Sequence, residues 1–270
     1  AGVPPDYFAV DGQLWGNPIY RWDKMAEDNY SWWAQRIHMN LVQSDIARID
    51  HFRGFAGYWE IPGTEETAVK GRWVDGPGIP FFQAIQERMG DLPIIAEDLG
   101  VMTPDVEELR DRFAFPGMKI LQFAFGGEQN SDFLPYNFVP NSVVYTGTHD
   151  NETTLGWYLN ASESERDHAR RYMAVSGRDI VWDLIRLAYA SVSVMAIIPM
   201  QDLFVLGNEA RMNYPGKEGG WWQWRYTREM FAARAPGIAL GLGELTRLFG
   251  RAPAEPEETE AEPEASPATE

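Results

Sequence analysis

Short apolar runs alternate with helical patterns along most of this chain. Each run is rich in branched residues, and all but one of them end at an acidic residue. None of them alternates regularly between apolar and polar positions, which is typical of strands that are buried on both faces of a parallel sheet. The runs cover residues 46–50, 92–97, 118–123, 143–150 and 195–202. We therefore predict parallel strands in these five places.

Helical patterns lie between the predicted strands. Thr103 followed by Pro104 has the form of an N-cap with proline at the first helical position. Residues 162–165 read Ser-Glu-Ser-Glu, which is the spacing of a capping box. Apolar residues also recur at helical spacing in two other segments, one of which is followed by Gly90. Helices are expected after Pro104 and over about 163–175, 179–194 and 80–89.

Strands that alternate with helices at this spacing predict an α/β fold with a parallel sheet covered by helices. No glycine motif of the phosphate-binding type follows any strand, which disfavours a nucleotide-binding sheet. The remaining common architecture is a (β/α)8 TIM barrel, whose chemistry lies at the carboxyl ends of its strands. Five strands cannot close such a barrel, so we expect residues 1–250 to form an incomplete one.

The end of the chain differs in composition from the rest. Residues 251–270 contain seven Glu, four Pro and one Arg, with no aromatic or branched aliphatic residue. Such a segment buries too little apolar surface to offset the entropy lost on ordering, so we predict a disordered acidic tail. The whole chain carries a net charge of −17, which argues against binding to nucleic acid.

Cysteine is absent, which excludes disulfides, zinc thiolate sites and thiol nucleophiles in this chain. No apolar run approaches the roughly 20 residues that a membrane-spanning helix needs. No basic segment followed by an apolar one opens the chain either. From these features we expect a soluble cytoplasmic protein with no membrane partner. No cluster of metal ligands is evident in the sequence, so we also expect no metal and no cofactor.

Three acidic residues stand at or just beyond predicted strands, namely Asp50, Glu97 and Asp150. Acids at the ends of neighbouring strands of a barrel can meet across one substrate. Glycosyl transfer with retention needs such carboxyl groups, one as nucleophile and one as proton donor. Each acid alone could equally be a helix cap or a solvated loop residue. Their shared position favours a catalytic set.

The residues around two of these acids suggest different roles for them. Arg48 lies two positions before Asp50, so both point to the same side of a strand, and its guanidinium would keep Asp50 ionised as a nucleophile. Glu97 follows an apolar run that would raise its pKa toward that of a general acid. Asp98 should face the opposite way and is expected to be structural.

Longer motifs resemble the amylomaltase or disproportionating-enzyme family of α-amylase-like barrels, the 4-α-glucanotransferases of glycoside hydrolase family 77. They run from near residue 4 to Arg225, nearly all of the expected folded chain. The motifs are PPDYFAVDGQLWGNPIYRW (4–22), RIDHFRGFAGYWEIP (48–62), IIAEDLG (94–100), GTHDNETT (147–154) and PMQDLFVLGNEARMN (199–213).

The resemblance implies a role for each acid. Asp50 would be the nucleophile, Glu97 the acid/base, and Asp150 a residue that stabilises the transition state. It also implies that Arg48 and His149 line the subsite of the attacked glucose. Because the resembled enzymes are about twice as long, it implies that the first strands of the barrel are missing here. The N-terminal part of the same enzyme is therefore an expected partner, beside maltooligosaccharide substrates.

Aromatic residues supply the remaining candidates for substrate binding. The segment 4–18 is rich in Pro and Gly, so we expect a loop, and in the resembled family the matching loop covers the active site. Its rings either pin the loop to its own domain or stack on glucose while excluding water. The aromatic candidates are Tyr7, Phe8, Trp15, Tyr58, Trp59 and Phe123, and Gln13 of the same loop is a polar candidate. Trp221 departs from the family pattern, which has Asn at this place, and is not among the candidates.

Two other functions stay open from the sequence. An α-amylase-type hydrolase would use the same carboxyl groups with water as the acceptor. A non-catalytic maltodextrin-binding fragment would keep the motifs but lack the missing strands. The aromatic loop favours the transferase over the hydrolase, and so do the motif residues, which are closer to those of the transferases. The presence of all three acids argues against the binding fragment.

Overall fold

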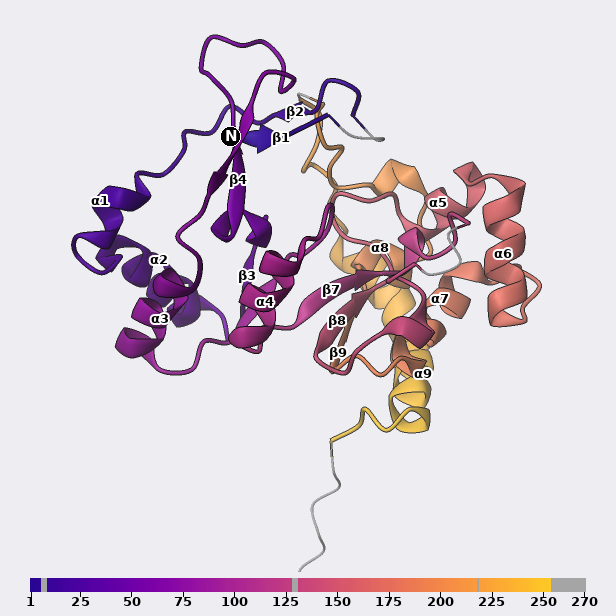
Figure 1. Ribbon diagram of the computed structural model, residues 1–270. Helices are drawn as coiled ribbons and strands as arrows, with labels where there is room; N and C mark the ends of the chain where they lie inside the picture. Colours follow the sequence, from indigo (N-terminus) through magenta and orange to yellow (C-terminus); the bar gives the residue numbers. More distant parts are fainter. Residues whose placement is uncertain (6–8, 128–130, 218, 254–270) are drawn as a thin grey trace, which may run out of the picture. The chain divides into compact units, whose positions relative to one another are not determined.

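The structure is a computed structural model that describes residues 1–5, 9–127, 131–217 and 219–253 (Figure 1). The chain divides into two compact units, Ala1–Tyr226 and Thr227–Glu270. The tail expected over 251–270 lies outside the described residues from residue 254 onward. The first unit holds all of the candidate catalytic residues.

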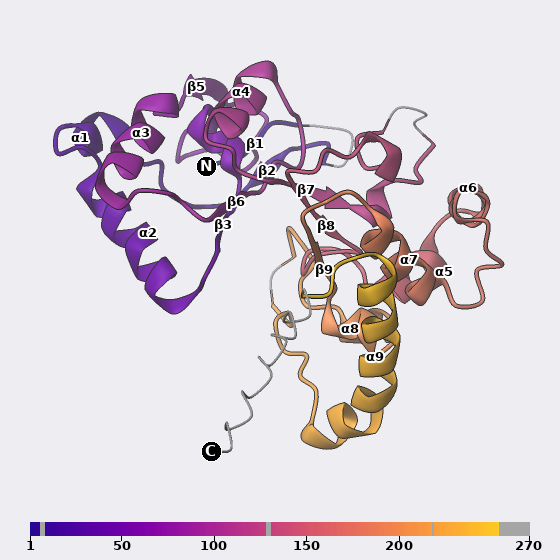
Figure 2. The same ribbon diagram turned by 90° about the horizontal axis from the view of Figure 1, so that it is seen from below.

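Parallel strands occur in each of the five predicted runs, so this prediction is confirmed. The first two pair with each other, and the last three form a sheet in sequence order. Figure 2 shows them side by side in that order. The strands are β3 (Ala47–Ile49), β6 (Ile94–Ala96), β7 (Gly117–Ile120), β8 (Ser142–Tyr145) and β9 (Met195–Ile197).

Asp98 links β6 to β7. Its carboxylate is buried and accepts hydrogen bonds from the backbone N–H of Met118 and from Arg110, both at 2.7 Å. The N–H of Ala96 also donates to the carbonyl of Pro116 at 2.9 Å. Gly117 is required here because a Cβ would lie 2.1 Å from the Asp98 carboxylate. Asp98 is therefore structural, as its place on the strand predicts.

The predicted helices are also present. Ser162 and Glu165 form the predicted capping box, in which each side chain accepts a hydrogen bond from the other residue's backbone N–H. Thr103 and Pro104 begin their helix as expected, although the Thr103 side chain makes no capping bond. These helices are α3 (Gly78–Met89), α4 (Pro104–Arg112), α6 (Glu163–Met173) and α7 (Ile180–Ala190). Helix α5 (Thr154–Asn160) is an additional one that the sequence did not predict.

The structure also contains elements that the sequence did not predict. Helices α1 (Trp22–Ala26) and α2 (Ser31–Gln43) precede β3, and Figure 2 shows α2 beside α3. The run 195–202 is a strand only to Ile197, after which α8 (Met200–Leu203) begins. Short 3₁₀ helices follow several strands or loops, namely η1 (Phe52–Phe55), η2 (Leu121–Phe123), η3 (Pro135–Asn137) and η4 (Asn208–Ala210).

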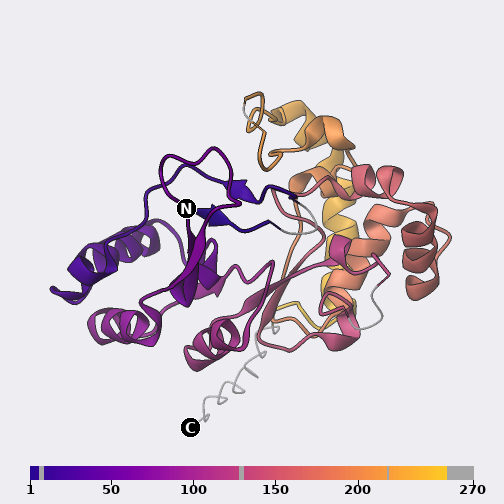
Figure 3. The same ribbon diagram turned by 45° about the horizontal axis from the view of Figure 1, so that its top comes forward.

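The expectation that 4–18 is wholly a loop is wrong. Gln13–Leu14 forms strand β2, which pairs with β1 (Gly2–Val3) in a hairpin drawn in indigo in Figure 3. This hairpin joins an antiparallel sheet of order β2-β1-β4-β5, with β4 at Gly57–Glu60 and β5 at Arg72–Asp75. Two-residue strands leave too few positions for a period of two to be recognised.

Aromatic packing forms much of the core beside β3 and β6. Phe52 and Phe82 stack at 5.5 Å between ring centroids, and Trp33 of α2 meets Phe81 of α3 at 5.6 Å. Most of these rings are fully buried. A second cluster, which includes Ile95, Met118, Ile120, Val143 and Tyr145, packs among the parallel strands. The core thus holds the carboxyl ends of the strands in place.

The second unit contains the long helix α9 (Arg228–Leu248), which is absent from the predicted set. Thr227 caps it, its hydroxyl accepting a hydrogen bond from the N–H of Met230 at 3.2 Å. Pro236 lies inside the helix. No helix of the described residues, α9 included, is long and apolar enough to cross a membrane.

Candidate active site

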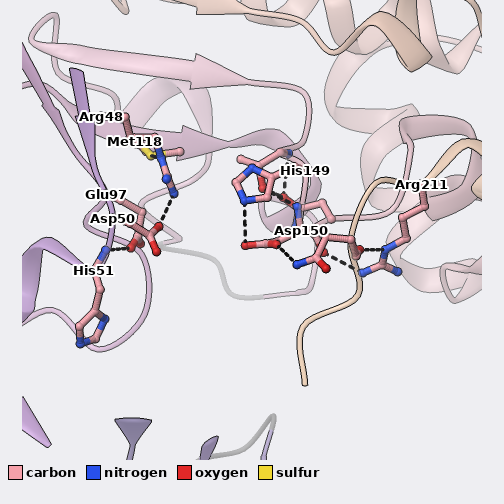
Figure 4. A network of polar contacts seen from close by, with 11 residues as sticks. Arg48, Asp50, His51, Glu97, Met118, His149, Asp150 and Arg211 are labelled. Carbon is pink, nitrogen blue, oxygen red and sulfur yellow. Dashed lines mark hydrogen bonds and ion pairs between the residues drawn. The ribbon is translucent and has the colours of Figure 1, made fainter. Parts of the chain in front are cut away.

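Asp50 directly follows β3 and is held by Arg48 of the same strand. The Arg48 Nη2 atom lies 2.8 Å from Asp50 Oδ1. Arg48 is itself steadied from β7, because its Nε lies 3.3 Å from the sulfur of Met118 (Figure 4). The Asp50 side chain is 75% exposed. The predicted pair on one side of the strand is present, and its carboxylate is open to an incoming molecule.

Glu97 stands beside Asp50 because β3 and β6 pair in parallel with Ile49 opposite Ala96. The backbone pairing continues past both strand ends. Glu97 N–H donates to the carbonyl of Ile49 at 2.9 Å, and Phe52 N–H donates to the carbonyl of Glu97 at 3.0 Å. Figure 4 shows the two carboxylates as neighbours at this edge.

The Glu97 carboxylate is largely enclosed. Its Oε2 accepts the backbone N–H of His51 at 2.6 Å, and its Oε1 accepts that of Leu99 at 2.8 Å. Burial raises its pKa above that of an ordinary glutamate, and the negative charge of Asp50 adds to this rise. The two backbone hydrogen bonds and Arg48 act in the opposite direction without reversing the shift. The direction agrees with the apolar setting noted in the sequence.

His51 is a site residue that the sequence analysis did not single out. Its backbone has φ of 49°, a left-handed conformation that turns its N–H toward Glu97. Its imidazole meets the ring of Trp15 edge to face, with 4.8 Å between centroids. Burial lowers the pKa of His51 to about 4, so the ring is neutral near pH 7. His51 therefore connects the β1–β2 hairpin with the Glu97 carboxylate.

Asp150 lies in the loop after β8 and is held by residues near 210. Its Oδ1 accepts a hydrogen bond from Asn213 Nδ2 at 2.7 Å, and its Oδ2 lies 3.4 Å from His149 Nε2. Arg211 donates to the carbonyl of Asp150 at 2.7 Å. In Figure 4 the Asp150 carboxylate points toward the side on which Asp50 and Glu97 lie.

Asn213 and Arg211 were quoted only as part of a motif in the sequence. No spacing rule places residue 213 beside residue 150. The contact depends on the fold, which also lets the N–H of Asn213 donate to the carbonyl of His149 at 3.0 Å. The ring of His149 lies 5.2 Å from that of Trp222.

The structure locates most of the aromatic candidates, whereas Tyr7 and Phe8 lie outside the described residues. Trp15 contacts His51 as described, and its indole N–H donates to Gln13 at 3.1 Å. Tyr58 and Trp59 lie on β4 of the antiparallel sheet. The Trp59 indole N–H donates to the carbonyl of Ala68 at 2.9 Å, so this ring is engaged in packing its own sheet.

Phe123 reaches an open pocket of about 710 Å³ beside Asp150. Its ring is 45% exposed and lies edge to face against Phe133, with 5.3 Å between centroids. Trp221 and Tyr214 line the same pocket from the segment that also carries Asn213. Of the predicted residues, the structure therefore gathers Arg48, Asp50 and Glu97 in one group and His149, Asp150 and Phe123 in another.

The chemistry that this arrangement can perform follows from the two strand-end carboxyl groups. Asp50 is exposed and ion-paired, as a nucleophile requires. Glu97 has a raised pKa and is partly enclosed, as a proton donor requires. Two neighbouring carboxyl groups in different environments are the set used in glycosyl transfer with retention. The described residues contain no group of three or more His, Asp or Glu side chains that could hold a metal ion.

Comparison with known proteins gives the same family throughout. The family model described as 4-alpha-glucanotransferase matches residues 1–230. A 4-alpha-glucanotransferase of Synechocystis sp. is 50% identical over 93% of this chain and 50% of its own length. The Thermus thermophilus 4-alpha-glucanotransferase is 53% identical over 83% of this chain and 47% of its own. The chain spans about half the length of these curated relatives.

Solved structures agree in fold. An amylomaltase from Streptococcus agalactiae in complex with acarbose is 43% identical, with a TM-score of 0.88 over 93% of this chain and 50% of its own. An amylomaltase from Corynebacterium glutamicum, 18% identical, has a TM-score of 0.73 over 91% of this chain and 42% of its own. Together with the site geometry and the family match over most of the chain, these likenesses show that the chain belongs to glycoside hydrolase family 77, the family described as 4-alpha-glucanotransferase.

Proposed function

We propose that this chain carries the catalytic carboxyl groups of a 4-α-glucanotransferase acting on maltooligosaccharides and other α-1,4-glucans. The observation that carries the proposal is the parallel pairing of β3 with β6, which brings the exposed, ion-paired Asp50 next to the enclosed Glu97 with its raised pKa. The names of the relatives support the same activity. We further propose a cytoplasmic location, in keeping with a chain that has no cysteine.

The proposed reaction is a double displacement. Protonated Glu97 gives its proton to the glycosidic oxygen while Asp50 attacks the anomeric carbon, which forms a glycosyl ester and releases the shortened glucan. Glu97, now ionised, then takes the proton of an acceptor hydroxyl as that oxygen attacks the same carbon and frees Asp50. Asp150 stabilises the positive charge that develops on the sugar, and Arg48 and His149 line the subsite of the attacked glucose.

We also propose that the first unit is the C-terminal part of a (β/α)8 barrel of the α-amylase-like type. The parallel strands follow one another in chain order, as they do in such a barrel. Among the described residues β3 pairs only with β6, and β9 only with β8. Each therefore leaves a free edge that the N-terminal half of the enzyme would cover. That half is the proposed partner.

The proposal is tested by comparing this chain alone with the chain joined to the N-terminal half of the Thermus thermophilus relative, here called the joined enzyme. With maltotriose we expect the joined enzyme to release glucose together with longer oligosaccharides. The chain alone should show no turnover, no cooperative thermal transition by circular dichroism, and self-association in light scattering, because its sheet edges are open. Turnover by the monomeric chain alone, or none by the joined enzyme, would contradict the proposal.

Hydrolysis is the reaction that competes with transfer at the same carboxyl groups. A glycosyl ester on a carboxylate that is 75% exposed can be attacked by water as well as by a sugar. Transfer requires that water be kept out while the acceptor binds. The contact of Trp15 with His51 brings the β1–β2 hairpin next to the carboxyl pair, where an indole can exclude water.

Replacing Trp15 by Ala in the joined enzyme is therefore expected to raise the share of hydrolysis. The loss of the indole opens the intermediate to water and removes a surface on which an acceptor glucose can stack. Released reducing ends would be measured against disproportionation products from maltotriose. Trp32→Ala on α2, which removes an indole that is 50% exposed, is the matched control and should leave the ratio unchanged. An unchanged ratio in Trp15→Ala would mean that this ring has only a packing role.

A further inference from the structure

One buried carboxylate anchors both ends of the loop that carries His149 and Asp150. Asp202 of α8 is only 1% exposed. Its Oδ2 accepts hydrogen bonds from the hydroxyls of Thr146 and Thr154 at 2.6 and 2.7 Å. Its Oδ1 accepts the backbone N–H of Thr154 at 2.8 Å. Thr146 directly follows β8 and Thr154 begins α5, so the loop 147–153 is closed across this carboxylate.

The segment after Asp202 also contacts the middle of the loop. Asn208 accepts the N–H of Thr153 at 3.3 Å and donates to the carboxylate of Glu152 at 2.6 Å. Asn213 and Arg211 hold Asp150 at the distances given above. Residues 202–213 thus contact the loop at its ends and along its length.

We infer that Asp202 is a positioning residue that acts on catalysis through Asp150. The inference rests on the proposed function, since it concerns the role assigned there to Asp150. An ionised carboxylate only accepts hydrogen bonds, and all three contacts of Asp202 come from groups that can donate. A buried hydroxyl or amide without its partner is unfavourable, so the loop ends stay on Asp202 and the Asp150 carboxylate stays at its place.

A purely structural role for Asp202 predicts a different outcome. In that case its loss would lower the stability of the whole unit and reduce activity irrespective of what stands at position 150. If Asp202 acts through Asp150, its loss matters only while the Asp150 carboxylate is present. A double-mutant cycle separates the two cases, because coupled residues are not additive.

The experiment compares Asp202→Asn with the parent joined enzyme, and then repeats the substitution in an Asp150→Asn background. An α-maltosyl fluoride donor keeps the rates of the weaker variants measurable. With Asp150 present we expect kcat to fall by about 10- to 100-fold with little change in KM, since small misplacements of a reacting group cost on this scale. In the Asp150→Asn background the further fall should be less than about 2-fold. An equal fall in both backgrounds would overturn the inference.

Two further variants keep the test decisive if Asp202→Asn folds poorly. Thr146→Val removes one buried donor to Asp202 and should give the same pattern in kcat, whereas Thr146→Ser should retain parent activity. Ser142→Ala is the matched control, because it removes a buried hydroxyl 2.8 Å from that of Ser193 at the opposite end of β8. It should lower the melting temperature without changing kcat. A fall in kcat with Ser142→Ala equal to that with Thr146→Val would contradict the inference.

Hydrogen exchange gives a readout that does not depend on turnover. Amides of residues 147–153 should exchange faster in Asp202→Asn than in the parent joined enzyme, and at the parent rate in Ser142→Ala. If these amides exchanged faster in Asp202→Asn but the parent joined enzyme transferred no glucan, the proposed function would be contradicted and the anchoring of the loop supported. If the parent joined enzyme transferred glucan but exchange in Asp202→Asn were unchanged, the inference about Asp202 would be overturned and the proposed function would stand.

Discussion

Replacing Asp50 by Asn is expected to abolish glucan transfer by the joined enzyme. An amide cannot attack the anomeric carbon, so the glycosyl ester has no attachment point. The expected fall in kcat is on the order of 10⁴- to 10⁶-fold, which is the scale seen when a nucleophile is removed. Maltotriose disproportionation measures it. The fold should be retained, because the Asp50 side chain is exposed and its ion pair lies near the surface.

The matched control for Asp50 is Asp45→Asn, which changes an exposed acid before β3 and should leave activity unchanged. Circular dichroism would confirm that both variants have the parent melting temperature. If Asp50→Asn kept more than about one per cent of parent activity, the covalent route through this carboxylate would be wrong.

Glu97→Gln is expected to slow the reaction of unactivated glucan donors but not the formation of the glycosyl ester from activated donors. Cleavage of unactivated glucan needs a proton on the leaving oxygen, so its rate should fall by about 10²- to 10⁴-fold. An α-maltosyl fluoride releases fluoride without a proton, so the glycosyl ester on Asp50 should still form from it. Without a base to activate the acceptor, that ester should then accumulate. Added azide, which needs no base, should restore its turnover.

The matched control is Glu87→Gln, which changes an exposed acid on α3 and should behave as the parent with both donors. Equal losses of rate with maltotriose and with the fluoride would show that Glu97 is not the proton donor.

The raised pKa of Glu97 sets the sign of a pH effect. Glu97 must be protonated for the first step, so kcat/KM for maltotriose should fall as pH rises through its pKa. Because burial raises that pKa, the fall should begin at a higher pH than for an ordinary glutamate. This fall in kcat/KM with rising pH should be absent with the fluoride donor and in Glu97→Gln. The pH profiles of the two donors therefore check the assignment independently of the rates.

The parallel strands could be predicted from the sequence because each lies in a mainly apolar run without regular alternation, and four of the five runs end at an acidic residue. Ile94 to Ala96 is buried on both faces, which the absence of alternation indicates directly. Asp50 and Glu97 could be found for the same reason, since a strand-end acid is visible without knowledge of strand pairing. The capping box at Ser162 was equally visible, because it involves residues three positions apart.

The rest of the site depends on contacts between distant segments. His51 faces Glu97 through a left-handed backbone conformation, which a non-glycine residue does not signal. Asn213 meets Asp150 only after helices α5, α6 and α7 and strand β9 have brought the chain back. Strand β2 gains its place by pairing with β1, and β1 in turn pairs with β4, more than 50 residues away. No local period could predict those partners.

The most direct test of the account is to find the residue that becomes covalently glycosylated. The joined enzyme carrying Glu97→Gln would be incubated with α-maltosyl fluoride or a slow 5-fluoro analogue, digested with protease, and examined by peptide mass spectrometry. We predict one maltosyl adduct on the peptide containing Asp50, absent when Asp50→Asn is combined with Glu97→Gln. An adduct on Asp150 or another residue, or inverted product with no adduct, would contradict a double displacement at Asp50.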